Sequence, residues 1–128
     1  MKFTTCLNCM DGRVQLPVIH WIKDNYSADY VDMITEAGMD GILSDACCNI
    51  NSLLKKIDIS LEKHNSNSIF IVGHYDCGGN IVSEETHREQ ICIAVENVKR
   101  QKPSVKVIGL WVSKEWTVEK IIERLIKE

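Results

Sequence analysis

Long apolar runs, clusters of basic residues and flexible linkers are all missing from this sequence. No apolar stretch is long enough to span a membrane, and the polar residues 1–13 lack the pattern of a signal peptide. The 15 Lys and Arg are outnumbered by 18 Asp and Glu and form no cluster, which argues against nucleic acid as a main partner. We therefore expect a cytoplasmic protein that binds neither nucleic acid nor membranes.

Features that divide a chain are also scarce. The sequence has two prolines, Pro17 and Pro103, and no Gly/Ser-rich linker, internal repeat or low-complexity segment. A length of 128 residues suits one domain whose core is large enough to fold unaided. We expect a single domain over residues 1–128.

Four short runs have the composition of strands, and each precedes a segment with helical spacing of its apolar residues. The strand runs are residues 2–8, 30–35, 68–74 and 105–112; the helical segments are 16–26, 49–64, 83–100 and 117–128, the last with Thr117 near its start and Lys127 in its last turn. This alternation predicts an α/β fold: a three-layer domain with a central parallel sheet of about four strands flanked by helices. The order 2-1-3-4 would set the first and third strands side by side.

Two short motifs follow those two strands. The first reads CMDGR, from Cys9 to Arg13, and the second reads HYDC, from His74 to Cys77. In parallel sheets, ligands bind beyond the carboxyl ends of the strands, so both motifs should lie at one edge. Cys and His are zinc ligands, and three protein ligands leave a fourth position for water, as in catalytic sites. Cys9, His74 and Cys77 are the candidate ligands.

Asp11 and Arg13 complete the first motif. Alternate side chains of an extended chain point to one side, so Cys9, Asp11 and Arg13 would share a common space if this segment is extended. A guanidinium holds a carboxylate bidentately and keeps it ionised. We expect Arg13 to fix Asp11 where it orients a zinc-bound water; a released Asp11 would be a fourth ligand in a closed state. Two thiolates weaken the polarising power of zinc, so activity should grow toward alkaline pH.

Together these residues resemble the β-class carbonic anhydrase family. That family carries Cys-x-Asp-x-Arg after the first strand and His-x-x-Cys-Gly after the third, as residues 9–13 and 74–78 do here. The stretch AGMDG, residues 37–41, is similar to the family's Ala-Gly loop, and the resemblance covers roughly residues 3–112. It implies that Cys9, His74 and Cys77 bind zinc, that Asp11 and Arg13 form a catalytic dyad, and that the backbone N–H of Gly78 contacts substrate.

The reaction implied by the resemblance is reversible hydration of carbon dioxide to bicarbonate by a metal-bound hydroxide. Family pockets are completed by a neighbouring subunit, which implies a homodimer or a higher even oligomer. The sequence departs from the family in lacking its N-terminal helical arm and its upstream Gln, and in carrying Thr35 and Glu36 where the family has Arg-Asn. We expect those two residues to decide substrate preference. Carbonyl sulfide or carbon disulfide hydrolysis and a non-catalytic zinc-binding module are the alternatives.

The remaining Cys, His and Trp residues have simpler interpretations. Cys6 and Cys9 form a C-x-x-C pair, so a thiol oxidoreductase is a rival, although Cys6 falls within a strand pattern. Other positions are expected to serve structure: Cys47 and Cys48 as loop thiols, Cys92 in the core, His20, His64 and His87 as surface or capping residues, Asp76 as a turn residue or acceptor, and Trp111 and Trp116 in the core or a subunit contact.

Overall fold

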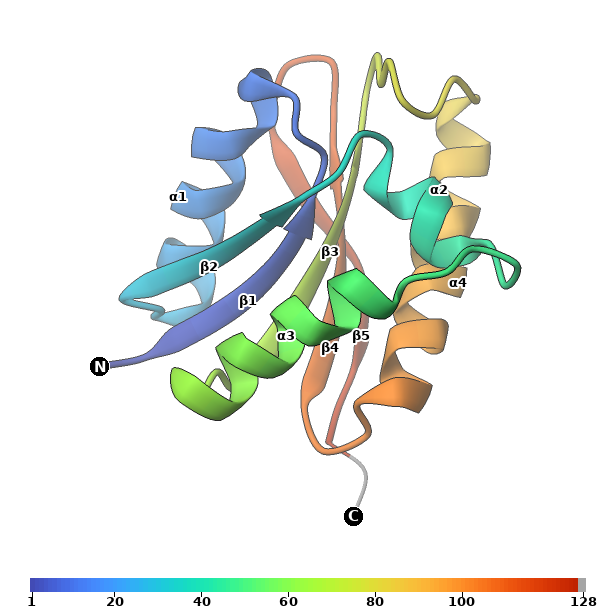
Figure 1. Ribbon diagram of the computed structural model, residues 1–128. Coiled ribbons are helices and arrows are strands. Elements are labelled where there is room, and N and C mark those ends of the chain that lie inside the picture. The colour runs from blue at the N-terminus through green and yellow to red at the C-terminus, as the bar shows by residue number, and fades with distance from the viewer. Residues whose placement is uncertain (127–128) are drawn as a thin grey trace.

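The computed structural model describes residues 1–126, and as far as residue 112 its strands and helices alternate as the sequence predicts (Figure 1). The strands are β1 (Phe3–Asn8), β2 (Tyr30–Thr35), β3 (Ser68–His74), β4 (Lys106–Val112) and β5 (Val118–Arg124); the helices are η1 (Gly12–Val14), α1 (Gln15–Tyr26), α2 (Met39–Ser44), α3 (Asn51–Lys63) and α4 (Glu84–Gln101). The strands form one sheet in the order β2-β1-β3-β4-β5, in which only β5 is antiparallel to its neighbour within the described residues. The predicted order 2-1-3-4 is confirmed, with a fifth strand at the edge.

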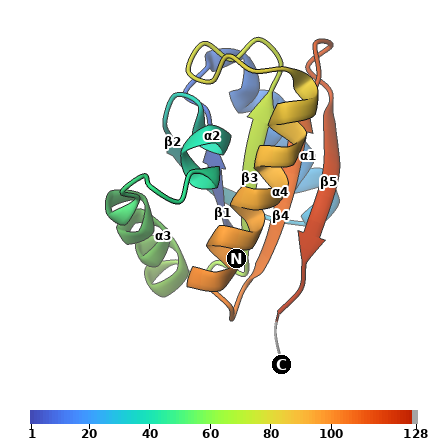
Figure 2. The same ribbon diagram turned by 90° about the vertical axis from the view of Figure 1, so that its right-hand side faces the viewer.

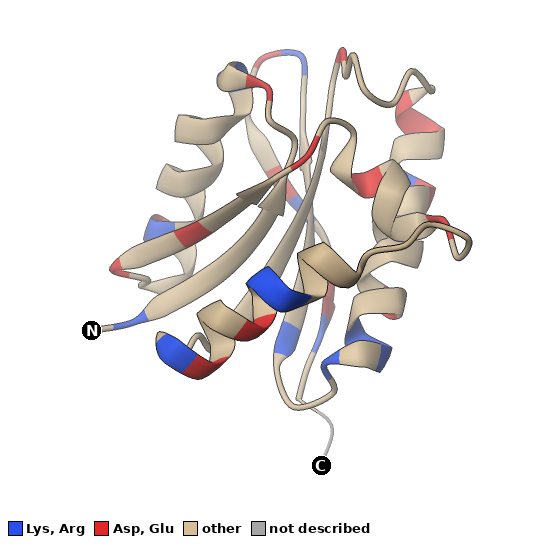
Figure 3. Ribbon diagram, viewed as in Figure 1, with Lys and Arg blue, Asp and Glu red and all other residues tan. Residues whose placement is uncertain are grey.

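Helices cover both faces of the sheet and give three layers (Figures 1 and 2). On one face, α1 packs Val18 and Ile22 against Phe70 and Leu110 of the sheet. On the other face, α2, α3 and α4 pack against residues such as Leu7, Ile71 and Trp111. β3 lies at the centre and is buried along its whole length, which is typical of a parallel strand covered on both sides. Basic and acidic residues are interspersed over the surface (Figure 3).

The helix predicted over residues 117–128 is wrong. Residues 118–124 form β5, which pairs with β4 in antiparallel register, while Lys127 lies outside the described residues. A register shift pairs Gly109 with Ile122 and Leu110 with Lys120, so Ile121 is an extra, bulged residue. The bulge lets the adjacent Ile121 and Ile122 both pack on the core. Val118, Ile121 and Ile122 therefore have the i, i+3, i+4 spacing that is typical of one face of a helix.

Residues 39–44 form a helix, α2, where the sequence suggested only a loop. Met39 and Leu43 are buried against α4 and the sheet, and Asp40 is buried between them. Ser83 is the N-cap of α4, and its side chain accepts a hydrogen bond from the backbone N–H of Thr86 at 3.1 Å.

β5 is fastened to α1 by a hydrogen bond with a predictable response to pH. The Tyr26 hydroxyl donates to Glu123 at 2.5 Å, and this bond holds the pKa of Glu123 below its ordinary value. A carboxyl whose pKa is lowered by folding stabilises the protein above its unfolded pKa of about 4.3, and that stability is lost as pH falls through the folded pKa.

We expect Glu123→Gln to lower the free energy of unfolding by about 1 kcal/mol at pH 7 and by much less at strongly acid pH, where wild-type Glu123 is itself protonated. Urea unfolding at the two pH values measures the difference. Glu115→Gln, at an exposed loop position, is the matched control. A Glu123→Gln effect of equal size at both pH values would contradict the assignment.

Candidate metal centre

Three buried ligand-type side chains meet at the carboxyl edge of the sheet. Cys9 directly follows β1, His74 ends β3, and Cys77 lies in the loop after it. One potential ligand atom from each residue lies within 4.8 Å of the other two, and the Cys9 and Cys77 Sγ atoms are 3.9 Å apart. The pairing of β1 with β3 brings them together across 65 residues of sequence. Within residues 1–126 they are the one such cluster of three or more.

The His74 ring is fixed in the orientation that a metal ligand needs. Its Nδ1 lies 2.7 Å from the carbonyl oxygen of Tyr75, so Nδ1–H donates and Nε2 carries the lone pair. Nε2 is buried, and among the described residues it has no hydrogen-bond partner. A buried polar atom without a partner is costly unless a ligand satisfies it.

The donor set fits zinc. Two sulfurs bound to one tetrahedral zinc at about 2.3 Å each lie about 3.8 Å apart, close to the separation of the Cys9 and Cys77 sulfurs. Burial raises the pKa of the Cys77 thiol, and neighbouring Cys9 raises it further, against backbone N–H groups that lower it. A bound cation would favour the thiolate there.

The segment between Cys9 and Arg13 is not extended, so the predicted alternation of its side chains is wrong. The chain turns after β1 into η1, a short 3-10 helix, and Asp11 caps it by accepting the Arg13 backbone N–H at 2.9 Å. The Gln15 side-chain amide donates to the carbonyl oxygens of Cys9 and Asp11 at 2.8 and 2.9 Å and holds the turn closed. Asp11 and Arg13 therefore meet through a helix cap.

The expected contact between Asp11 and Arg13 is present. Arg13 Nη2 lies 2.6 Å from Asp11 Oδ2, and Arg13 Nε lies 3.0 Å from Oδ1, which is a bidentate ion pair. Hydrogen bonds from Arg13 lower the pKa of Asp11 to about 2. Asp11 is therefore ionised throughout the neutral and alkaline range.

Asp76 and Trp116, for which only structural roles were expected, also contact Arg13. Asp76 accepts from Nη1 through its carboxylate at 3.2 Å and from Nη2 through its carbonyl at 3.1 Å. The Trp116 ring stacks on the guanidinium, with Cζ 4.6 Å from the ring centroid. Both residues have positive φ angles, 56° for Asp76 and 59° for Trp116. Asp tolerates this region well, whereas a bulky Trp rarely adopts it, so local strain is expected at Trp116.

Removal of the Trp116 ring should loosen Arg13. An exposed cation–π contact contributes about 0.5–1 kcal/mol, so Trp116→Ala should speed solvent exchange of the Arg13 Nε–H by about two- to fivefold. NMR of the arginine side chains measures that rate. Trp116→Tyr keeps a ring over the guanidinium and should stay close to wild type. An unchanged exchange rate in Trp116→Ala would show that the ring does not restrain Arg13.

Glycines allow the loops around the centre to approach one another. Gly38 has φ +67°, and a Cβ there would lie 2.5 Å from the carbonyl oxygen of Gly79. A Cβ on Gly79 would in turn lie 2.6 Å from the Ala37 carbonyl carbon. The AGMDG stretch therefore packs directly on the loop that carries Cys77 and Gly78. Gly78 itself is exposed at the mouth of the site.

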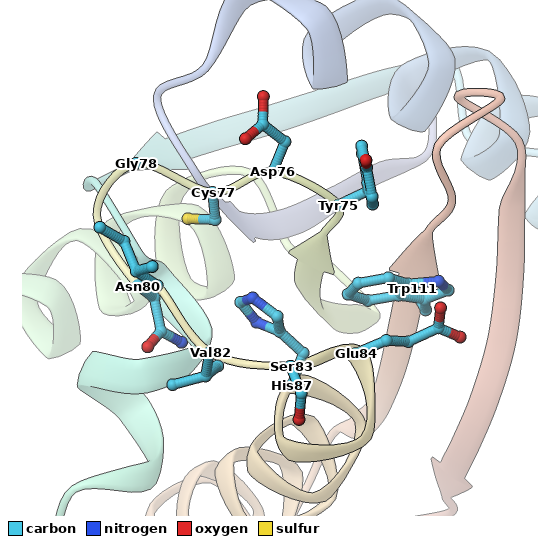
Figure 4. Close-up of a pocket in the computed structure, with 11 residues that line it drawn as sticks. Tyr75, Asp76, Cys77, Gly78, Asn80, Val82, Ser83, Glu84, His87 and Trp111 are labelled. Carbon is cyan, nitrogen blue, oxygen red and sulfur yellow. The ribbon is translucent and has the colours of Figure 1, made fainter.

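A cavity of about 450 Å³ opens beside Cys77 (Figure 4). Its lining residues come from the loop after β3, from the start of α4 and from β4: Tyr75, Asp76, Cys77, Gly78, Asn80, Ile81, Val82, Ser83, Glu84, His87 and Trp111. Thr35 and Glu36 do not line it, and Glu36 borders a separate hollow with Asn49. The lining of this cavity therefore gives no support to the expectation that these two residues decide substrate preference.

His87 was expected at the surface, and that expectation is wrong. Its side chain is 3% exposed, and its Nδ1 lies 2.6 Å from Oδ2 of Asp40, which is 1% exposed. The apolar residues Ile91, Val95 and Val98, which follow His87 at helical spacing, mark the buried face of α4 and could have placed it there. The signal for Asp40 was weaker, because α2 is only six residues long.

The other cysteines do not form a redox pair with Cys9. Cys6 is fully buried within β1, and burial raises the pKa of its thiol, which disfavours the reactive thiolate. Cys47 and Cys48 are exposed loop thiols, as expected, while Cys92 is only partly buried. His20 and His64 are exposed or partly exposed, and His64 contacts Asp32 at 2.6 Å. Trp111 is buried and packs in the core, as one of its two predicted roles.

Solved structures show the same fold. A carbonic anhydrase from Glaciozyma antarctica has a TM-score of 0.62 at 17% identity, over 92% of this chain and 81% of that one. The β-carbonic anhydrase CcaA has a TM-score of 0.64 at 13% identity, over 94% and 80%. One of two tetrameric β-carbonic anhydrases from Sordaria macrospora has a TM-score of 0.54 at 15% identity, over 94% and 81%. Among curated proteins, no sequence matches this chain.

The match to a protein-family model shows which family this chain belongs to. The model described as "Putative carbonic anhydrase" matches residues 1–122, nearly the whole chain. The matched region contains Cys9, His74 and Cys77 and the ion pair of Asp11 with Arg13. The chain therefore belongs to this carbonic anhydrase family of carbonate dehydratase-type lyases, and it has the fold of the β class.

Proposed function

We propose that the protein catalyses the reversible hydration of carbon dioxide to bicarbonate at a zinc ion held by Cys9, His74 and Cys77. The observation that carries this proposal is the convergence of two buried sulfurs and the unpartnered Nε2 of His74 beside an ionised carboxylate. Three protein ligands leave a fourth position, which distinguishes a catalytic zinc site from a closed structural one.

Zinc, when bound, supplies a Lewis acid that lowers the pKa of a coordinated water. The protein contributes side chains that orient the water nucleophile. Asp11 is ionised and held at both oxygens by Arg13, so it can accept a hydrogen bond from a water nucleophile without turning. Arg13 is itself held by Asp76 and Trp116, so the carboxylate is fixed from two sides. In this proposal Asp11 and Arg13 are the catalytic dyad.

The same contacts oppose a closed state of the site, in which Asp11 would become a fourth metal ligand. That movement would break the bidentate ion pair with Arg13. The turn held by Gln15 also resists it, because the Asp11 carbonyl is tied to that side-chain amide. We therefore assign the open state as the resting state of this chain.

Substrate would enter through the cavity beside Cys77. Its wall includes apolar side chains of Tyr75, Ile81, Val82 and Trp111, which suit a small uncharged molecule. Gly78 lines the same cavity, and we propose its backbone N–H as the donor to a substrate oxygen or to bicarbonate.

Carbonyl sulfide and carbon disulfide are the competing substrates, and a non-catalytic zinc module is the alternative from another class. Initial rates for all three molecules, with equal amounts of zinc-loaded protein, separate these functions. We expect carbon dioxide to be turned over fastest. Faster turnover of either sulfur compound would make that compound the substrate. If none of the three molecules were turned over, the protein would be a non-catalytic zinc-binding module.

A second copy of the chain is the partner that we propose, in a homodimer or a higher even oligomer. Three exposed apolar side chains line the cavity, namely Tyr75, Ile81 and Val82, and Ile81 is 89% exposed. A neighbouring subunit that covered them would close the open side of the cavity. Light scattering of the active protein tests this, and a fully active monomer would overturn it. In the described part of the chain, no helix is both long and apolar enough to cross a membrane.

A further inference from the structure

A network of four polar side chains lies beside the loop that carries Cys77. Asp40 comes from α2, His87 and Gln90 come from α4, and Asn80 belongs to the loop itself. Asp40 Oδ2 lies 2.6 Å from His87 Nδ1, and both side chains are almost completely buried. None of the four belongs to the three-residue metal cluster, but the network reaches the chain beside two of its members.

The Asn80 side-chain amide ties the loop to both helices. Its Nδ2 atom donates to Asp40 Oδ1 at 3.0 Å and to Gln90 Oε1 at 2.6 Å. Both N–H bonds of one amide nitrogen are therefore used, which fixes the orientation of the side chain. Figure 4 shows this side chain extending from the loop toward α2, where a Cβ at Gly41 would lie only 2.8 Å from the Nδ2 atom. The amide is therefore held by close packing as well as by hydrogen bonds.

The loop that is fixed in this way directs two backbone N–H groups at the Cys77 sulfur. The N–H groups of Gly79 and Asn80 both form hydrogen bonds with the Cys77 side chain. Gly79 is also packed tightly, since a Cβ there would lie 2.7 Å from the Gly38 backbone nitrogen. Two donors on one sulfur restrict the direction in which its remaining lone pair can point, and this orients the sulfur as a metal ligand.

The Asp40 carboxylate also lies against the strand that ends in His74. A Cβ at Gly73 would lie 2.5 Å from Asp40 Oδ2, so the carboxylate contacts β3 one residue before the candidate ligand. The second carboxylate oxygen, Oδ1, accepts the Asn80 amide and the Gly41 backbone N–H, the latter at 2.9 Å. One buried group therefore connects the end of β3 with the loop that follows it.

We propose that Asn80 is a positioning residue of the metal centre. Asp40 and Gln90 hold its side chain, and that side chain holds the loop whose N–H groups face the Cys77 sulfur. This inference rests on the proposed function, because it assigns Asn80 to the zinc site of that reaction. A residue that served stability alone would lower the free energy of unfolding and leave the metal–sulfur bond unchanged.

The zinc affinity of the intact protein, measured by competition with a chromophoric chelator, tests this role. We expect Asn80→Ala to weaken zinc binding by about tenfold, because loss of a group that orients a metal ligand typically costs about 10- to 100-fold in affinity. Gln90→Leu removes one of the two acceptors and should act in the same direction.

Asn97→Ala is the matched control. The Asn97 side-chain amide also connects α4 with α2, by donating to the Leu43 carbonyl oxygen at 3.0 Å, but it makes no contact with the loop after β3. This variant should lose stability and keep the zinc affinity of the wild type. An affinity of folded Asn80→Ala that matches that of Asn97→Ala would overturn the proposal.

Cobalt(II) in place of zinc gives a second readout, the charge-transfer absorption band from sulfur to metal. N–H donors lower the energy of the sulfur electrons, so misplacement of these donors in Asn80→Ala should move the band to longer wavelength. The band of Asn97→Ala should stay at the wild-type position. An unchanged band in folded, cobalt-loaded Asn80→Ala would also overturn the proposal, whatever its affinity.

Cadmium NMR of the wild-type protein needs no variant. We expect scalar coupling across the N–H···S bonds, between bound cadmium and the amide protons of Gly79 and Asn80. Absence of both couplings in the loaded protein would overturn the proposal even if Asn80→Ala fails to fold. Wild-type protein that binds none of these metals would overturn the metal centre as well, whereas metal binding without hydration of carbon dioxide would overturn the proposed function alone.

Discussion

Zinc content should fall from about one per chain to less than about one tenth when Cys77 is replaced by Ser. A serine hydroxyl keeps its proton at neutral pH and is a poor substitute for a thiolate, while two remaining ligands bind zinc weakly. The fall should be large because the described cluster holds only Cys9, His74 and Cys77, and the nearby Asp11 is held by its ion pair with Arg13. Elemental analysis of the purified variant measures it.

Cys92→Ser is the matched control for that experiment. Cys92 is a partly buried thiol on α4, outside the cluster, so its variant should keep the full metal content. Circular dichroism of both variants separates loss of metal from loss of fold. Full zinc in a folded Cys77→Ser protein would remove Cys77 from the ligand set.

Asp11→Asn should retain zinc and lose at least about 100-fold in kcat/KM for carbon dioxide. The amide has nearly the same shape but no charge, so it forms no ion pair with Arg13 and is a much weaker acceptor for a water proton. Arg13→Lys should lose activity in the same direction, because an ammonium cannot reproduce the bidentate contact. Stopped-flow rates at equal zinc loading measure both.

Asp24→Asn, an exposed change on α1, serves as the control and should match wild type. The pKa of Asp11, lowered to about 2 by Arg13, adds a second check. Protonation of Asp11 should not limit activity at any pH where the protein is folded and loaded. Activity of Asp11→Asn within about threefold of wild type would show that the carboxylate does not orient the nucleophile.

The parallel core and the metal cluster were predictable because they depend on strand order and on local composition. Once β1 and β3 are neighbours, Cys9 and His74 must meet at one edge of the sheet. β5 was not predictable from periodicity, since the bulge at Ile121 gives a strand the apolar spacing of a helix. The cap formed by Asp11 was missed for a similar reason: a two-residue spacing fits both an extended chain and a tight turn.

The second set of site residues was harder to foresee. Asp40, His87, Asp76 and Trp116 reach the site through packing between α2, α4 and the loops after β3 and β4, and such contacts leave no fixed spacing in the sequence. A histidine after two acids at a helix start looks exposed. Only the apolar face that continues along α4 indicates that it points inward.

The central claim is metal-dependent hydration of carbon dioxide at the Cys9, His74 and Cys77 site. Its most direct test is stopped-flow hydration by the intact protein, measured after zinc is removed with a chelator and again after zinc is restored. We predict activity that is lost with the metal, returns with about one zinc per chain and increases toward alkaline pH. Full zinc occupancy with no hydration of carbon dioxide at any pH would contradict the account.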